Sequence, residues 1–90
     1  MLILITYDKK SKEKDYSPLY EEIKKCGDYW WHYMESVWLV HTSLSPEECN
    51  NRLRGSIGQD DYLLVVEITN QKRQGWLPSK AWEWIKLHDN

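Results

Sequence analysis

The chain contains no phenylalanine, although aromatic residues make up 13% of its 90 residues. All of its aromatics are tryptophan and tyrosine, six of each, so every ring carries a polar atom as well. Such side chains suit surfaces that are apolar at one end and hydrogen-bonded at the other, including protein interfaces and platforms on which bases stack. Glycine is also scarce, with four residues and no cluster, which excludes a glycine-rich phosphate loop.

Cysteine and histidine are few and widely spaced. Cys26 and Cys49 make no disulfide framework and fit no paired metal spacing, and the three histidines lie far apart. The formal net charge of −2 excludes a strongly basic protein that coats long nucleic acid. The apolar run near residue 1 is too short for a signal peptide or a membrane span, so we expect a cytoplasmic protein without membrane contact.

The order of predicted elements is that of one small domain, residues 1–90. Hydrophobic runs predict strands at 2–7, 29–34, 37–42 and 62–68. Helices are predicted between Ser17 and Gly27, between Ser45 and Gly55, and from about Pro78 in a tryptophan-rich tail at about 75–90. The core, about 1–68, therefore has the βαββαβ order of an α+β, ferredoxin-like fold, with both of its helices on one face of the sheet.

Helix punctuation supports these boundaries. Ser17 is predicted to cap the first helix, and Gly27 suits the position just past its end. Ser45 and Glu48 have the spacing of a capping box at the start of the second helix.

The adjacent pair Trp30 and Trp31 raises a packing question. Neighbouring side chains of a strand point to opposite faces, so one face carries Trp31 between Tyr29 and Tyr33, and the other carries Trp30. Two helices cover only one face of a sheet. We therefore expect the C-terminal segment, a second copy of the chain, or both to cover the second face, and we predict a homodimer.

Short motifs at 5–8 ("ITYD") and 36–38 ("SVW"), together with the order of elements over 1–68, resemble the CRISPR-associated Cas-two family. The toxin-like VapD proteins share that broad architecture. The chain is also similar to small Cas-two-like proteins of bacteria and phages with tails such as "WLPSKAWEWI". The resemblance implies a twofold dimer in which Asp8 of each subunit binds Mg²⁺ and serves phosphodiester cleavage, with Ser36 near the dimer cleft.

Other residues are candidates for ligand binding. Lys9 and Lys10 follow Asp8 and could bind phosphate there, and a solvated loop is the alternative for both. Arg54 could add a phosphate contact. Aromatic side chains that could stack on bases, or instead pack in a core or interface, include Tyr7, Trp31 and Trp38.

Three hypotheses of function follow. The one we favour is a non-catalytic dimer that binds a nucleotide or short nucleic acid in its cleft; in a phage, such a protein could sequester a nucleotide signal of host defence. The second is a metal-dependent nuclease with paired Asp8 carboxylates, the one place where a cofactor, Mg²⁺, is expected. The third is a module whose exposed tryptophans bind or inhibit a protein partner.

Overall fold

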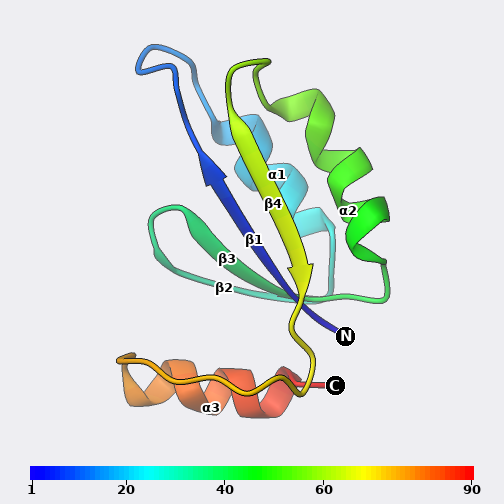
Figure 1. Cartoon of the computed structure of the whole chain (residues 1–90), viewed down its shortest axis with the longest axis vertical. Helices are drawn as coiled ribbons and strands as arrows, with labels where there is room; N and C mark the ends of the chain where they lie inside the picture. The colour runs from blue at the N-terminus through cyan, green and yellow to red at the C-terminus, as the bar shows by residue number, and fades with distance from the viewer.

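The computed structural model describes all 90 residues as an α+β domain with a four-stranded antiparallel sheet and three helices (Figure 1). The elements are, in chain order, β1 (Leu2–Asp8), α1 (Ser17–Lys25), β2 (Tyr29–Met34), β3 (Val37–His41), α2 (Pro46–Leu53), a short 3-10 turn (Arg54–Ser56), β4 (Tyr62–Glu67) and α3 (Ser79–His88). The four predicted strands are confirmed to within one residue at each end. The arrangement is compatible with a ferredoxin-like fold. No helix has the length and apolar character needed to cross a bilayer.

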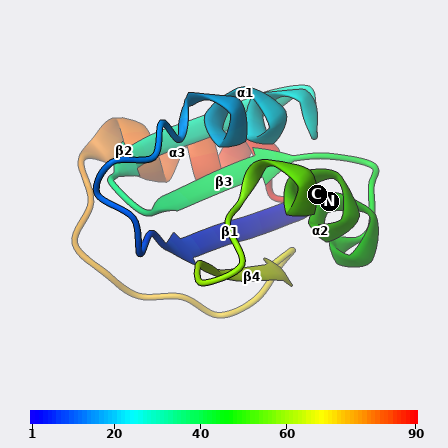
Figure 2. The same cartoon turned by 90° about the horizontal axis from the view of Figure 1, so that it is seen from above.

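The strands lie in the order β2-β3-β1-β4, and every neighbouring pair is antiparallel. The two central strands are β1 and β3, and Leu4 of β1 lies between Leu39 of β3 and Val66 of β4. Seen from above, α1 and α2 lie together on one side of the sheet (Figure 2). Strand β1 is central because it is the most continuous apolar run of the chain, which suits a strand buried on both faces.

The main core lies between the sheet and helices α1 and α2. Alternate residues of β1 point into it, and Ile3 and Ile5 are fully buried there. The same alternation puts Trp38 and Val40 of β3 into this core. The helices contribute a buried apolar stripe each, made of Leu19, Ile23, Cys26, Cys49 and Leu53. Both cysteines are free and buried, so they act as core residues.

One predicted helix cap is confirmed and one is wrong. The Ser45 hydroxyl accepts a hydrogen bond from the Glu48 N–H at 3.1 Å, and the Glu48 carboxylate accepts one from the Ser45 N–H at 3.2 Å, which completes the capping box of α2. Ser17 does not cap α1, because it is the first residue of that helix. Its N–H and hydroxyl both donate to Asp15 Oδ1, at 2.9 and 2.7 Å, so the carboxylate of Asp15 occupies the hydroxyl that capping requires.

Gly27 lies just past α1, as predicted, but for another physical reason. No glycine of the chain has a positive φ, so the left-handed conformation typical of glycine at helix ends is absent. A Cβ at this position would instead meet the carbonyl oxygen of His41 at 2.1 Å and Val40 Cγ1 at 2.6 Å. Gly27 is needed because the chain passes against the end of β3, where the Asp28 N–H donates to His41 O at 2.9 Å.

Helix α3 covers part of the second face of the sheet. A smaller core forms there from Leu2, Trp31 and Leu39 of the sheet and from Ala81 and Ile85 of the helix. Trp82 and Trp84, which the helical period places on different sides of α3, flank this stripe, and each is half-buried against it. The C-terminal segment therefore covers Trp31 on the second face of the sheet, as expected, and leaves this side chain 5% exposed.

A polar clasp holds the tail in place. The Arg73 guanidinium donates to Asp89 Oδ2 at 2.9 Å, and the backbone N–H of Asn70 donates to Asp89 Oδ1 at 2.7 Å. Asn70 has a positive φ of 56°, a conformation that asparagine tolerates better than most residues, and it reverses the chain after β4. The Arg73 side chain holds the pKa of Asp89 below its usual value, and the Asn70 N–H adds to this effect. The clasp thus fixes both ends of the tail against β4.

We predict that Ile85→Ala destabilises the protein by about 2–5 kcal/mol, because it opens a cavity between α3 and the sheet. Leu87→Ala is the matched control, since Leu87 lies two residues further along the same helix and is 76% exposed. We expect the control to change the unfolding free energy by less than about 0.5 kcal/mol. Urea denaturation of the three proteins checks both values, and equal stabilities would show that α3 contributes little to the fold.

Candidate functional site

Polar and charged residues are frequent in the segments where β1 ends and β4 begins. These segments lie at the end of the molecule opposite α3 (Figure 1). Two segments without regular structure meet there, residues 9–16 after β1 and residues 57–61 before β4. We call this region the loop end. Two of its hollows lie beside β4, and both are lined in part by Tyr62 and Leu63. A third and smaller hollow, of about 150 Å³, lies between the two segments and is lined by Lys10, Ser11, Lys14, Gly58, Gln59, Asp60 and Asp61.

Asp61 joins the two segments of the loop end. Its Oδ1 accepts hydrogen bonds from the Lys10 N–H and the Tyr16 hydroxyl, both at 2.8 Å. Its Oδ2 accepts one from the Gly58 N–H at 2.7 Å. The bond from the Lys10 N–H does most to hold the pKa of Asp61 below its usual value, and the bonds from Tyr16 and Gly58 add to it. The ionised carboxylate therefore anchors both segments.

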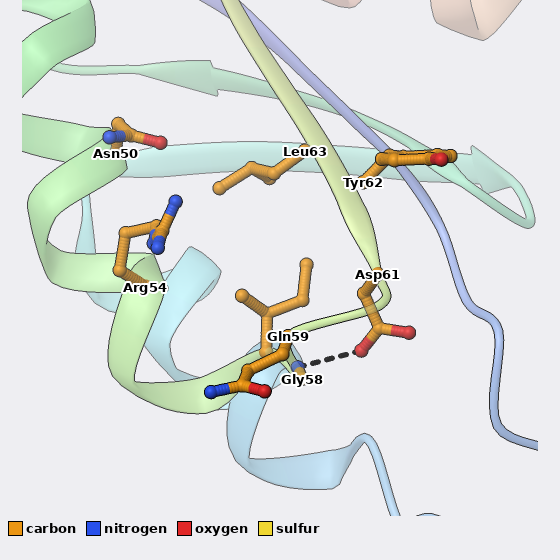
Figure 3. A pocket seen from close by; sticks show the side chains of 8 residues that line it. Asn50, Arg54, Gly58, Gln59, Asp61, Tyr62 and Leu63 are labelled. Atoms are coloured by element: carbon orange, nitrogen blue, oxygen red, sulfur yellow. Dashed lines mark hydrogen bonds between the residues drawn. The ribbon is translucent and has the colours of Figure 1, made fainter.

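The first hollow lies between α2 and β4 and has a volume of about 330 Å³. Figure 3 shows Asn50 projecting from α2 and Arg54 from the 3-10 turn that follows it, with Leu63 of β4 pointing toward them. The Tyr62 ring points away to the other side of the strand in the same view. The complete lining of this first hollow is Asn50, Arg54, Ile57, Gly58, Gln59, Asp61, Tyr62 and Leu63. We call this hollow the α2–β4 pocket.

Arg54 gives the α2–β4 pocket its chemical character. Its guanidinium takes part in none of the ion pairs of the chain and in none of its side-chain hydrogen bonds. Asp61, the one carboxylate in the lining, is bound to Gly58 instead. A guanidinium without a partner, next to the amides of Asn50 and Gln59, offers several donors to one ligand, and its fork matches the oxygens of a phosphate or carboxylate.

The second hollow, of about 220 Å³, lies on the other side of β4, and Asp8 is part of it. Alternation along β1 places the Asp8 side chain on the face of the sheet that is away from α1 and α2. Its Oδ2 lies 2.6 Å from Lys10 Nζ, and this Nζ also lies 5.0 Å from the centre of the Tyr62 ring. The Asp8 carboxylate raises the pKa of Lys10, so the lysine stays charged.

The lining of the Asp8 hollow does not fit a divalent metal within one chain. Nowhere in the chain do three or more histidine, cysteine, aspartate or glutamate side chains gather in a way that could hold a metal ion. Asp8 is the only carboxylate that lines this hollow, and it is already paired with the ammonium of Lys10. A single carboxylate paired with a cation is a poor ligand set for Mg²⁺.

Tyr7 and Trp38 come together in the core, and Ser36 lies beside them in the turn between β2 and β3. The Trp38 indole N–H donates to the Tyr7 hydroxyl at 3.0 Å, and that hydroxyl donates to Glu35 O at 3.0 Å. The backbone of Tyr7 also bonds to Ser36 O, at 3.3 Å, in the turn between β2 and β3. Burial raises the pKa of Tyr7, which keeps the hydroxyl protonated and able to donate. These three residues fix the turn to the end of β1.

Lys9 belongs to the same cluster. Its ammonium donates to the Tyr20 hydroxyl at 2.8 Å and lies 5.3 Å from the centre of the Tyr16 ring. The bond to Tyr20 is the main reason why the pKa of Lys9 is raised. Lys9 and Lys10 therefore point to different partners. Lys10 also lines the small hollow between the two loop segments.

The two tryptophans proposed for base stacking do not lie at the loop end. The His32 ring stacks on Trp38 at 3.7 Å between ring centres, with 14° between the ring planes, and Trp38 is 2% exposed. Trp31 is covered by α3 on the other face of the sheet. Neither ring has a free face, whereas the Tyr62 ring is 67% exposed. Sequence reasoning did not select Tyr62, Asp61, Asn50 or Gln59, because nothing in the sequence placed the turn at 58–61 beside α2.

No known protein family, no curated protein and no solved structure matches this chain. The resemblance to the Cas-two family therefore depends on the short motifs and on the order of elements.

We predict that Asp61→Asn destabilises the protein by about 1–3 kcal/mol at neutral pH, because it removes a charged acceptor of three hydrogen bonds. The folded pKa of Asp61 lies below the unfolded value of about 3.9, so its contribution is complete above that value and is lost as the pH falls through the folded pKa. The difference between wild type and variant should shrink accordingly below about pH 4 in urea denaturation.

Asp60→Asn is the control for this experiment, since Asp60 is the exposed neighbour of Asp61 and accepts none of the three hydrogen bonds that Asp61 accepts. Its effect on stability should be within about 0.5 kcal/mol. A difference between wild type and Asp61→Asn that does not change with pH would contradict the role of the Asp61 charge.

Proposed function

We propose that the chain is a Cas-two-like, ferredoxin-like homodimer that binds a nucleotide or a short nucleic acid at its loop end. The observation that carries this proposal is the guanidinium of Arg54, which has no partner in a pocket of about 330 Å³. An arginine in a hollow with no carboxylate free to pair with it favours an anionic ligand. The phosphate of a nucleotide is such a ligand.

The surroundings of Arg54 suit the rest of a nucleotide. The amides of Asn50 and Gln59 each offer a donor and an acceptor to a base edge or a sugar. Across β4, the exposed ring of Tyr62 offers a surface on which a base can stack. Because Tyr62 lines both hollows, a ligand that extends around the start of β4 would reach Arg54 on one side and this ring on the other.

The same region favours binding over cleavage. The ammonium of Lys10, at 2.6 Å, neutralises the Asp8 carboxylate, and the hollow around Asp8 contains no second carboxylate. The pKa of Lys10 is raised by its hydrogen bond to Asp8, so the pair stays ionised and presents no unpaired carboxylate to a metal ion. A protein that binds but does not cut would sequester its ligand, and this agrees with a role against a nucleotide signal of host defence.

We predict that Arg54→Ala weakens binding of a short oligoribonucleotide by about tenfold or more, since a charged hydrogen bond to phosphate is worth about 1.5–3 kcal/mol. Arg52→Ala is the matched control, because Arg52 lies in the last turn of α2, is exposed as Arg54 is, and does not line the pocket. It should change the affinity by about twofold or less. Isothermal titration calorimetry with the oligonucleotide, with adenosine triphosphate and with a cyclic dinucleotide measures the three affinities. Equal losses in both variants would indicate nonspecific attraction, and no binding by the wild type would contradict the proposal.

The nuclease hypothesis has its own test. We expect the wild type to leave single- and double-stranded RNA and DNA intact in the presence of Mg²⁺ or Mn²⁺. Asp8→Asn keeps the size of the side chain and removes its charge, so a binder should retain its affinity or gain some. Cleavage by the wild type together with its loss in Asp8→Asn would show that paired Asp8 carboxylates are catalytic and that the preference for binding is wrong.

A further inference from the structure

Helix α3 covers only part of the second face of the sheet. Beyond it, the β4 side chains on this face are Tyr62, Leu64 and Val66, which are 67%, 57% and 38% exposed. They lie beside Leu4 and Thr6 of β1, which are half-buried. A row of exposed apolar side chains on the flat face of a sheet is unusual in a monomer and marks an interaction surface.

This row continues into an apolar groove between the sheet and α3, with a volume of about 330 Å³. Of its 13 lining residues, 10 are hydrophobic, and among them are Leu4, Val37, Leu39 and Trp82. Trp76 stands at its rim and is fully exposed, at 101% of its reference area. The largest apolar side chain of the segment between β4 and α3 therefore contacts nothing while an apolar groove lies open beside it.

The charges around this surface are neutralised within the chain. Arg73, the one charged residue that lines the groove, is paired with Asp89 at 2.9 Å. Asp8 and Lys10 form their pair at the other end of the row. Two identical surfaces of this kind can meet without like-charge repulsion, which favours a second copy of the chain over a partner of opposite charge.

Apolar area for a dimer contact is present on this surface. A buried tryptophan removes about 150–250 Å² from water. Trp76 supplies the largest part, and Leu64, Val66 and the exposed Met34 add to it toward the roughly 800 Å² per partner of a standard interface. Tyr62, at the end of the row where β4 begins, stays outside the contact and remains free for a ligand. Under a twofold axis, each protomer offers one tryptophan and one groove, so the contact closes on itself.

We propose that this surface is the interface of the homodimer and that Trp76 of each protomer inserts into the groove of the other. The inference rests on the homodimer of the proposed function and identifies the surface that forms it. Trp76 is then the central anchor, Leu64 and Val66 pack across the twofold axis, and the two α2–β4 pockets remain accessible because they lie on the opposite side of β4.

Sedimentation equilibrium at micromolar concentration tests the proposal on the full chain. The wild type should have about twice the chain mass of 10.9 kDa. Trp76→Ala should weaken the dimer by about tenfold or more, as expected for a central aromatic anchor. Leu64→Lys should do the same by placing a charge in the interface. Leu87→Ala removes an exposed apolar side chain of α3 outside the groove and should leave the dimer unchanged.

Because Trp76 has no intramolecular contact to lose, the monomeric variant should keep the circular dichroism spectrum of the wild type. Its urea midpoint should be independent of protein concentration, whereas that of the dimeric wild type should rise with concentration. A wild type that sediments as a monomer would overturn the inference and leave this surface to a different protein. A dimer that Trp76→Ala and Leu64→Lys leave intact would overturn it as well, since the interface would then lie elsewhere. Calorimetry with the oligoribonucleotide on the same variants keeps the two proposals separate: loss of the dimer tests the interface, and loss of binding in Arg54→Ala tests the pocket.

Discussion

Burial of β1 on both of its faces is the constraint on which the rest of the structure depends. Leu2, Ile3 and Ile5 have no exposed surface. Ile3 and Ile5 point to the side of α1 and α2, and Leu2 points to the side of α3. A βαββαβ unit supplies helices for one side only. The molecule must therefore recruit α3 for the other side, and the Arg73–Asp89 clasp holds this helix where β1 begins. Because β1 is central, its other end is fixed in space as well, and the loop end is built there.

The two neighbouring tryptophans, Trp30 and Trp31, lie on opposite faces of the sheet and differ in burial. Trp31 lies on the side that α3 covers and is nearly buried, whereas Trp30 lies over α1 and stays 44% exposed. Lys24 covers part of the Trp30 ring at 5.1 Å, a contact that a long lysine side chain can make while its charge stays in water. The hydroxyls of two buried tyrosines show what phenylalanine would lack. The Tyr7 hydroxyl donates to Glu35 O in the turn between β2 and β3, and the Tyr16 hydroxyl donates to Asp61 at the loop end. Phenylalanine would fill the same space without those bonds.

Much of the fold could be predicted from the sequence because its signals are local. Alternation at 29–34 gave the correct faces of Trp30 and Trp31, and the serine–glutamate spacing at Ser45 gave the correct start of α2. The alternation is wrong for Met34, because a register shift between Trp31 and Met34 puts both side chains in the groove beneath α3. The site was less accessible to sequence reasoning. Arg54 was selected as an isolated cation, but its pocket depends on the packing of α2 against β4, which no local pattern encodes. Trp38 was selected as a stacking ring, and the structure places other rings on it, because burial depends on contacts between distant segments.

The tail also explains why the two sides of β4 differ in chemistry. On the side of α1 and α2, the β4 residues Leu63 and Val65 pack on the main core, and the pocket beside them is polar because the end of α2 projects over it. On the other side, α3 lies across the end of the sheet where β4 finishes, so the start of this strand stays uncovered and apolar. Figure 1 shows α3 lying across this end of the sheet, at a large angle to β4. The buried residues of α3 pack on Leu2, Trp31 and Leu39, and its C-terminal His88 lies beside Tyr29 and His41 of β2 and β3. The placement of α3 therefore leaves an apolar surface along β4 on one side of the sheet, opposite the polar pocket beside α2.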